Sequence, residues 1–272
     1  MFKNIVSLLS LVPVIALGAQ AEGTFNETIE GYKFFKSGPN VLLPKIEYEM
    51  SAARTALRLL KESLGSDGLI QTLQPEIKKA DTFWKDAIAK SSGTWVPADG
   101  RAVAFLPNIT AARFAYWSQS DLADKANHAA NPEHYVKRTK KNPDGTLVSE
   151  ILEGWGGVTT HFTIPNYGTP DRTKYPFLRE LPEFPIQFQA AGDKVLMDGT
   201  IFGVLHISVR DVPGAPYEQS QNGIEVFASV WYGDGVKDEH LEDERTHITT
   251  EIINLTTQAQ KDFDSGVYQP PF

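Results

Sequence analysis

The sequence predicts an α+β fold, with helices in the first half of the chain and strands in the second. Between residues 45 and 130, apolar residues recur at spacings of three and four, which is the period of an amphipathic helix. After Asn131-Pro132, short β-type segments alternate with Gly, Asn and Asp turn signals. Hydrophobic residues make up 41% of the chain, which is enough for a real core and excludes whole-chain disorder.

Length, charge and cysteine count narrow the classes of function. A chain of 272 residues is expected to form one or two domains. Its net charge of −8 argues against the basic footprint of a nucleic-acid-binding protein. It has no cysteine, which excludes a disulfide scaffold, a thiolate nucleophile and Cys-based zinc or iron–sulfur sites. The chemistry must therefore come from carboxylates, histidines and backbone donors.

Residues 1–21 have the pattern of a secretory signal peptide. Lys3 provides the positive start, residues 5–17 the apolar run, and Ala19-Gln20-Ala21 the cleavage pattern. The run is short for a bilayer span, and an uncleaved anchor is the alternative. We expect cleavage, a product in the ER lumen or secreted, and no membrane segment after cleavage. N-x-S/T sequons predict a glycoprotein with one or two used sites among Asn26, Asn108 and Asn254.

Residues 22–130 are predicted to form an N-terminal helical extension that packs on the sheet. It starts with an extended lead, residues 22–44, which Gly and Pro residues interrupt. The helical segments that follow are residues 46–64 with a C-cap at Gly65, a segment from Ser66 or Asp67 to a break at Pro75, residues 76–90 and residues 110–130.

Residues 131–272 are predicted to form the sheet domain. A proline-rich loop at residues 167–185 is long enough to suggest a functional loop or lid. Residues 147–153 are ambiguous, and residues 249–263 form a final helix. The predicted strands are residues 134–139, 158–164, 184–190, 195–210, 224–232 and 236–244, and the predicted turns are residues 142–145, 191–194 and 233–235.

The last third of the chain resembles the SnoaL-like or ketosteroid-isomerase-like members of the nuclear-transport-factor-like superfamily. The matching pieces are residues 184–190, Gly192-Asp193-Lys194-Val195, residues 198–209, residues 223–232, Gly233-Asp234-Gly235 and Glu239-His240-Leu241-Glu242. The aromatic residue that the family has after the histidine is Leu241 here. The resemblance implies a curved mixed or antiparallel sheet that forms a cone-shaped pocket, and a homodimer.

Size and export signal make the chain similar to a narrower group, the fungal ketosteroid-isomerase-like cyclases, which include the maleidride dimerising cyclases. This similarity implies a cofactor-independent cyclase of secondary metabolism. Such an enzyme couples polyketide-derived units, in the narrowest case maleic anhydrides, by base-initiated carbon–carbon bond formation.

Proton transfer next to a carbonyl needs a general base, an oxyanion donor and a water-poor pocket. His161, His206 and Glu242 are the candidate bases, and the resemblance places Glu242 where the family often keeps its acid. Arg245 or the backbone of Gly156-Gly157 is the candidate oxyanion donor. Each candidate has a structural alternative: a solvated edge strand for Glu242, a satisfied structural histidine for His206, and a chance glycine turn for His161.

Five residues are candidate walls of a substrate pocket. Alternation along the predicted strand at residues 195–210 puts Asp198 and Phe202 on the face of His206. Aromatic residues in strands belong to the core by default, which is the alternative. The candidate substrate-binding residues are Trp155, Gly157, Asp198, Phe202 and Tyr232.

No metal site and no cofactor are predicted. His240 and His247 are seven residues apart, and the chain has no H-x-x-x-H or H-E-x-x-H pair. His128 and His134 are six apart across a proline turn, which is a weak signal. The sequence also lacks a G-x-S-x-G elbow, and no G-x-G follows a strand and opens a helix.

Two functions remain open. The first is a cyclase or isomerase that acts on a small-molecule substrate, and the second is a secreted protein that binds an apolar small molecule without catalysis. Convergence of His161, His206 and Glu242 on one cavity would support the enzyme, and side chains that all point away would count against it.

Overall fold

The computed structural model describes residues 25–36, 44–143 and 146–270, and the chain divides into two compact units, residues 1–56 and 57–272. The first unit contains an antiparallel hairpin of β1 (Phe25–Ile29) and β2 (Tyr32–Lys36). Both residues of its turn, Glu30 and Gly31, have positive φ angles, which suits a tight hairpin. The hairpin replaces part of the predicted extended lead. The predicted signal peptide lies outside the described residues.

The helices of the first half follow the predicted breaks. In α1 (Lys45–Thr72), Gly65 leaves the helical geometry with φ 63° and ψ 175°, at the residue predicted as a C-cap. In α2 (Gln74–Lys90), Pro75 lies in the first turn, where a missing backbone N–H costs nothing. None of the helices within the described ranges is long and apolar enough to cross a membrane.

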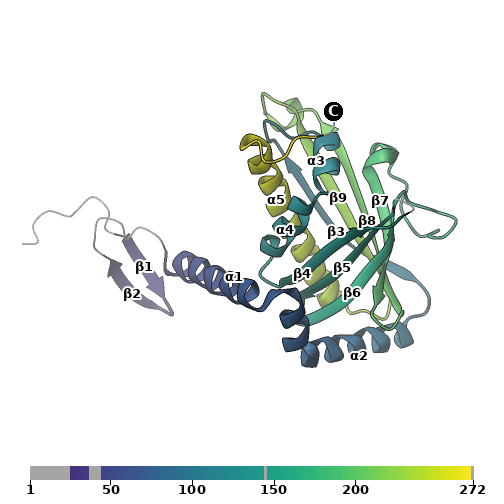
Figure 1. Cartoon of the computed structure of the whole chain (residues 1–272). Helices are drawn as coiled ribbons and strands as arrows, with labels where there is room; N and C mark the ends of the chain where they lie inside the picture. Colours follow the sequence, from purple (N-terminus) through teal and green to yellow (C-terminus); the bar gives the residue numbers. More distant parts are fainter. Residues whose placement is uncertain (1–24, 37–43, 144–145, 271–272) are drawn as a thin grey trace, which may run out of the picture. The chain divides into compact units, whose positions relative to one another are not determined.

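The second unit is built on one seven-stranded antiparallel sheet in the order β3-β9-β8-β7-β6-β5-β4. The sheet curves around α5 (Asp238–Asp264), which packs on β3, β5 and β9 (Figure 1). The predicted α+β fold with a curved antiparallel sheet is therefore confirmed. The strands are β3 (Trp95–Ala104), β4 (His134–Lys141), β5 (Leu147–Trp155), β6 (Val158–Tyr167), β7 (Gln189–Leu196), β8 (Ile201–Val212) and β9 (Gly223–Gly233). The remaining helices are α3 (Ala111–Trp117), α4 (Asp121–Ala130), η1 (Ile186–Phe188) and η2 (Ala215–Tyr217).

The main core fills the inner side of the sheet, between the strands, α2 and α5. Trp84 of α2 is fully buried, and its indole N–H donates a 2.8 Å hydrogen bond to Thr160 Oγ1. On the edge strand β3, Gly100 permits close approach of α5, because an added Cβ would lie 2.4 Å from Ile248 Cγ2. This contact holds the helix against the sheet and directs its inner side chains over the strands.

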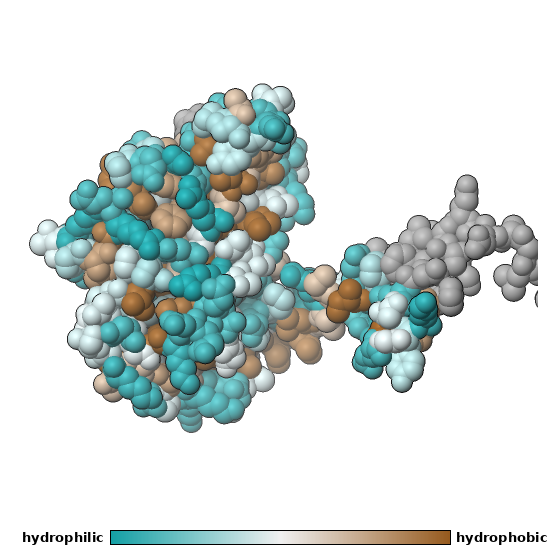
Figure 2. All heavy atoms as spheres, turned by 180° about the vertical axis from the view of Figure 1, so that it is seen from behind, coloured by the Kyte–Doolittle hydropathy of each residue, from teal (hydrophilic) through white to brown (hydrophobic). Residues whose placement is uncertain are grey.

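The outer face of the sheet is covered differently. Residues from the loop between β6 and β7, Tyr175 and Leu178, form a separate core cluster with Ala191, Val204 and Trp231. Leu69 and Ile77 form a third core cluster with Val136 of β4 and Leu152 of β5. Apolar and polar residues are interspersed on the face of this unit that Figure 2 shows, as is normal for a protein surface. The long loop that the sequence predicts is present and packs on the sheet.

The predicted boundary near residue 130 is wrong. β3 pairs with β9 along its whole length, from Trp95↔Gly233 to Ala104↔Ile224, so residues 95–130 belong to the sheet unit. The strand was missed because Ala98, Gly100 and Ala102 are small residues, which leave room for α5 but give little hydrophobic alternation.

Four further elements differ from the prediction. Residues 184–190, predicted as a strand, contain η1, and β7 starts only at Gln189. The predicted helix at residues 110–130 is two helices, because Ser120 caps α4 through its side chain. Residues 191–194 form no turn and lie within β7; the turn is at residues 197–200, where Gly199 has φ 91°. Residues 238–244, predicted as a strand, are the start of α5, whose first turn carries Asp238 and Glu239. Acidic residues stabilise a helix N-terminus.

Candidate functional site

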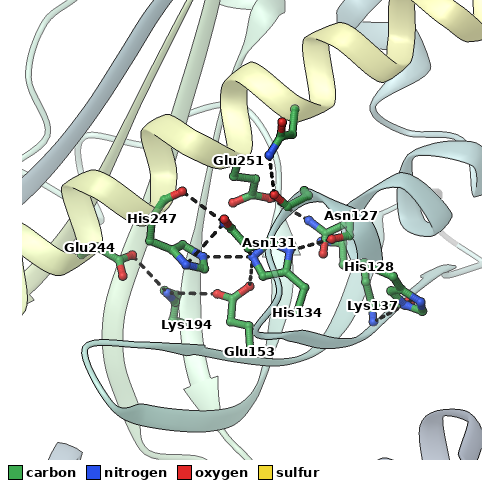
Figure 3. Close-up of polar contacts among 12 residues, drawn as sticks. Asn127, His128, Asn131, His134, Lys137, Glu153, Lys194, Glu244, His247 and Glu251 are labelled. Atoms are coloured by element: carbon green, nitrogen blue, oxygen red, sulfur yellow. Dashed lines mark hydrogen bonds and ion pairs between the residues drawn. The ribbon is translucent and has the colours of Figure 1, made fainter. Parts of the chain in front are cut away.

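A lysine is buried at the inner face of the sheet. Lys194 on β7 is 3% exposed, and its Nζ lies 3.8 Å from Glu153 Oε1 on β5 and 3.8 Å from Glu244 Oε1 on α5. Nζ also donates a 3.3 Å hydrogen bond to Tyr232 Oη on β9. Figure 3 shows Lys194 between the two glutamates. We call Lys194, Glu153, Glu244 and Tyr232 the lysine centre; four separate elements contribute to it.

Aromatic rings surround the ammonium group of Lys194. Its Nζ lies 4.3 Å from the ring centre of Trp155, 4.7 Å from Phe162, 5.5 Å from Phe202 and 5.7 Å from Tyr232. A cation is attracted to the face of a ring at such distances. Three predicted pocket walls, Trp155, Phe202 and Tyr232, are therefore brought together around one charged group.

Burial changes the acid–base properties of the lysine centre. Glu244 is 2% exposed, and burial raises its pKa to about 7, with Lys194 opposing this effect and Glu153 adding to it. Burial also raises the pKa of Tyr232 well above its ordinary value, which keeps the hydroxyl protonated. A carboxyl group that titrates near neutral pH is suited to general base catalysis.

A second polar group lies next to the lysine centre, between β4 and α5. His134 Nε2 is 3.0 Å from His247 Nε2. One ring nitrogen of each histidine and a carboxylate oxygen of Glu251 lie within 4.8 Å of one another. Glu153 connects the two groups, since its Oε2 is 3.8 Å from His134 Nε2. We call His134, His247 and Glu251 the histidine centre (Figure 3).

Two asparagines orient the histidine centre. His134 Nδ1 is 2.7 Å from the backbone oxygen of Asn127, so Nδ1 donates its proton there and Nε2 keeps a lone pair. The side-chain nitrogen of Asn127 donates a 2.7 Å hydrogen bond to Glu251 Oε1, and that of Asn131 donates to the His247 backbone oxygen. Burial lowers the pKa of both His134 and His247, so both imidazoles are neutral at neutral pH.

A groove of about 500 Å³ lies at the β3 edge of the sheet, beside the first turns of α5. Arg179 and Arg245 give it two cations, and Leu241 belongs to both the groove and the main core. The lining residues are Val96, Pro97, Asp99, Arg179, Asp234, Val236, Asp238, Leu241 and Arg245.

The two histidines predicted as bases lie on the outer face, away from the lysine centre. Alternation along β6 places His161 opposite Phe162, which contacts Lys194, and His161 Nε2 is 3.0 Å from Glu150 Oε1. His206 Nε2 lies 3.2 Å from Gln189 Oε1 and 3.2 Å from Ser208 Oγ, and burial, aided by Arg172, lowers its pKa to about 4. Neither histidine reaches the inner face.

Glu242 and Arg245 lie on α5, where the resemblance expects a strand. The Glu242 side chain is 70% exposed and forms a 2.9 Å ion pair with Arg245. Helical spacing gives Glu242 and Glu244 different surroundings, whereas the predicted strand placed them on one face. His161, His206 and Glu242 therefore do not converge on one cavity, and the hairpin that the resemblance needs is absent from this segment.

The glycine turn and Asp198 also differ from expectation. Gly156 closely approaches α5, since an added Cβ would lie 2.7 Å from His240 Nδ1, whereas Gly157 has open space around it. Asp198 is in the β7–β8 turn and pairs with Lys85 at 2.6 Å, so it shares no strand face with Phe202 or His206. A bulge at Lys194 and Val195 further interrupts the predicted alternation. Lys85 lowers the pKa of Asp198 to about 2.

The sequons have different surroundings. The side chain of Asn26 lies outside the described residues. Asn108 is exposed, and its side-chain nitrogen donates to Asp264 at 2.6 Å. Asn254 lies within α5, and its side-chain nitrogen donates a 2.6 Å hydrogen bond to the Ala130 backbone oxygen. The helical, half-buried setting of Asn254 disfavours glycosylation there, because acceptor sites lie in surface loops.

Sequence reasoning missed Lys194, Glu153, Glu244 and the histidine centre. Lys194 was assigned to a turn, and Glu244 to a charged strand. One local signal was present: His247 and Glu251 are four residues apart, a spacing that puts both on one face of a helix.

Comparisons with known proteins add a limited similarity of shape. No protein-family model matches the chain, and no curated protein matches it. The chain is similar to the crystal structure of Ara h 8.0201, with a TM-score of 0.40 and 9% identity over 62% of this chain and 99% of that one. It is also similar to ginseng major latex-like protein 151 from Panax ginseng, with a TM-score of 0.37 and 7% identity over 62% of this chain and 97% of that one.

Proposed function

We propose that the protein is a cofactor-independent proton-transfer enzyme in which Glu244 is the general base. The observation that carries the proposal is the carboxyl group of Glu244, which is 2% exposed, 3.8 Å from a buried ammonium group, and has its pKa raised to about 7 by burial. Charged groups of this kind are costly to bury, and strongly perturbed ones cluster at functional sites. Glu244 takes the role that the sequence assigned to His161, His206 or Glu242.

The lysine centre holds the groups that enolate chemistry needs. The Glu244 carboxylate removes a proton from a carbon next to a carbonyl, and the electron pair moves to the carbonyl oxygen. Lys194 Nζ and the Tyr232 hydroxyl donate hydrogen bonds to that oxygen, and the surrounding rings exclude water, which strengthens these interactions. The enolate carbon then adds to a carbon–carbon double bond conjugated to the carbonyl of a second unit, the π pair of that bond moves to the second carbonyl oxygen, and the enolate so formed takes the proton back from Glu244 at carbon.

The proposed substrate is a small, enolisable, polyketide-derived carbonyl compound. The resemblance of the sequence to fungal cyclases supports this class, with maleic anhydride units as its narrowest case. We place substrate entry at the groove, whose volume of about 500 Å³ is typical of small-molecule sites. Arg179 and Arg245 would bind carboxylate or carbonyl oxygens there in place of their present partners, Asp99 and Glu242. Leu241 lies one helical turn before Glu244. The signal-peptide pattern further supports action in the secretory pathway.

Exchange of hydrogen for deuterium at carbon tests the proposed step. An alkylated maleic anhydride in D₂O, followed by NMR, should exchange its acidic C–H faster with the wild-type protein than in buffer. Glu244→Gln should slow the catalysed exchange by about 100-fold or more, because a positioned base contributes at least that much. Glu239→Gln, an exposed position on the same helix, is the matched control and should leave the rate unchanged. Exchange at the buffer rate with the wild-type protein would overturn the enzyme proposal for this substrate class.

A second candidate is a protein that binds an apolar small molecule without catalysis. The three bases that the sequence predicts do not converge, which favours this candidate over the enzyme in its original form. The same experiment separates the two: binding of the anhydride, measured by calorimetry, without deuterium exchange would support the binding protein.

A further inference from the structure

We propose that the histidine centre binds one divalent transition-metal ion through His134 Nε2, His247 Nε2 and a carboxylate oxygen of Glu251. The inference rests on these three side chains and does not depend on the proton transfer proposed for Glu244. It adds a metal site where the sequence predicted none.

The two histidine nitrogens have the spacing that a bound ion requires, and the carboxylate of Glu251 lies close to it. First-row transition metals bind histidine nitrogen and carboxylate oxygen at roughly 2.0–2.2 Å, so two ligands on one ion lie ~3.0–3.4 Å apart in octahedral or tetrahedral geometry. The two imidazole Nε2 atoms are 3.0 Å apart, and one ligand atom from each of the three side chains lies within 4.8 Å of the others. In the ion-free protein this contact is a hydrogen bond that His247 Nε2 donates to His134 Nε2, and ion binding would replace it after the His247 proton moves to Nδ1. Small side-chain movements would bring all three to one ion.

The surrounding hydrogen bonds are those of a metal site. A metal-binding histidine usually donates its other ring N–H to a carbonyl or carboxylate, which fixes the tautomer and the ring orientation. His134 Nδ1 does so to the Asn127 backbone oxygen at 2.7 Å, which directs the Nε2 lone pair to the centre. The side chain of the same Asn127 holds Glu251 Oε1 at 2.7 Å. One residue therefore orients ligands from two different elements, β4 and α5.

The charges around the site favour a cation. The lysine and histidine centres together contain three carboxylates, Glu153, Glu244 and Glu251, and one ammonium, Lys194. Buried charge that is not balanced is strongly unfavourable. A divalent ion at the histidine centre would stabilise the ionised form of these buried carboxyl groups. His247 and Glu251 are half-buried, whereas His134 is fully buried.

The ligand types indicate the class of metal. Two imidazoles and one carboxylate suit Zn²⁺ or Fe²⁺, whereas Mg²⁺ and Ca²⁺ prefer sites made only of oxygen ligands. Three protein ligands also leave coordination positions open for water or another ligand. The proposal therefore names a divalent transition-metal ion and uses Zn²⁺ as the probe.

Metal uptake by the whole protein tests the proposal. After treatment with EDTA and removal of any affinity tag, the wild-type chain should bind one Zn²⁺ by calorimetry and should raise its Tm by about 5 °C or more at a Zn²⁺ concentration 100 times the Kd. An anaerobic Fe²⁺ titration decides which of the two ions binds more tightly. Absence of Zn²⁺ and Fe²⁺ binding, or equal binding of Mg²⁺, would overturn the proposal.

Ligand variants locate the ion. His247→Gln and Glu251→Gln should each weaken Zn²⁺ binding by about 100-fold, and Asn127→Ala by ~10–100-fold. His206→Gln on the outer face and Glu239→Gln on the exposed side of α5 are matched controls and should bind as the wild type does. Binding that His247→Gln and Glu251→Gln leave unchanged would place the ion elsewhere and overturn the assignment. If these variants do not fold, the absorption spectrum of Co²⁺ in the wild-type protein decides: no ligand-field bands would overturn the site.

Discussion

The two faces of one sheet hold ionisable residues in different environments. On the outer face, His161 has a hydrogen-bond partner at 3.0 Å, Glu150, and His206 has two at 3.2 Å, Gln189 and Ser208. On the inner face, Lys194 is paired with two glutamates inside a ring of aromatic side chains, and burial raises the pKa of Glu244 to about 7. The comparison shows that residue type and position in a strand do not identify a reactive group. The side of the sheet on which the residue lies, and the helices or loops that cover that side, determine its reactivity.

The largest expected effect is on stability, from removal of the inner-face cation. Lys194→Met leaves Glu153 and Glu244 buried without their ammonium partner, and we expect the free energy of unfolding to fall by about 3–5 kcal/mol. Urea denaturation followed by circular dichroism measures this. The matched change on the outer face is Lys174→Met. Lys174 is 45% exposed, and its partner Asp193 still accepts a hydrogen bond from the Tyr175 hydroxyl when the lysine is removed. That loss should stay below ~1.5 kcal/mol. Equal losses for the two variants would remove the distinction between the faces.

The pH dependence of stability comes next. Glu244 has an ordinary pKa of 4.5 and about 7 in the folded protein. Between these two pH values only the folded state keeps the proton on Glu244, and this proton uptake stabilises the folded protein. The stabilisation is complete below pH 4.5 and is lost as the pH rises through 7. It amounts to about 3 kcal/mol of the free energy of unfolding. Lys194, Glu153, Tyr232 and Glu251 act on this group. In EDTA-treated protein, the pH profile of the wild type minus that of Glu244→Gln isolates it. A difference in the free energy of unfolding that does not change with pH would contradict the raised pKa of Glu244.

The glycine turn next to the inner face should show a smaller effect. Gly156→Ala puts a Cβ 2.7 Å from His240 Nδ1 at φ 56°, and we expect a loss of about 2–4 kcal/mol from clash and backbone strain together. Gly157→Ala has φ 75° but open space, so strain alone should cost ~1 kcal/mol. Thermal unfolding of the two variants gives the comparison. A cost for Gly157→Ala as large as that for Gly156→Ala would show that α5 does not depend on this approach.

The smallest effects should come from the outer-face histidines. His161→Ala and His206→Ala should each reduce stability by about 1 kcal/mol, through lost hydrogen bonds. The rate of deuterium exchange should change by less than about threefold, since loss of a general base would cost ~100-fold or more. The stability and the deuterium-exchange rate of both variants and of Glu244→Gln, measured under the same conditions, test these two expectations. A 100-fold loss in either histidine variant would return the catalytic role to the outer face.

Much of the fold was predictable because its signals are local. The breaks at Gly65 and Pro75 follow from backbone chemistry that holds in any environment. The start of α5 was misread because the segment from Asp238 to Arg245 is almost entirely charged, although Leu241 continues the spacing of Ile248 and Ile252. β3 was not predicted because its inner residues are small. They are small because α5 packs closely on them, and α5 lies more than 130 residues away in the chain.

The candidate site was predictable only in part. Trp155, Phe202 and Tyr232 were identified from residue type, and the structure gathers them around Lys194. Lys194 itself was hidden, because Gly192-Asp193 reads as a turn when the pairing of β7 with β8 is unknown. His134 and His247 are 113 residues apart, so no spacing rule relates them.

By itself, the sequence determined the α+β class, the helix breaks and the exclusion of cysteine chemistry, because these depend on composition and on neighbouring residues. It also determined that any reaction must use carboxylates, amines or imidazoles. Only the tertiary structure decided which of these groups meet, because strand pairing and the position of α5 set the inner and outer faces. The environment of Glu244 follows from that arrangement: removal from water, one ammonium partner and other carboxylates nearby raise its pKa in a way that no local pattern encodes.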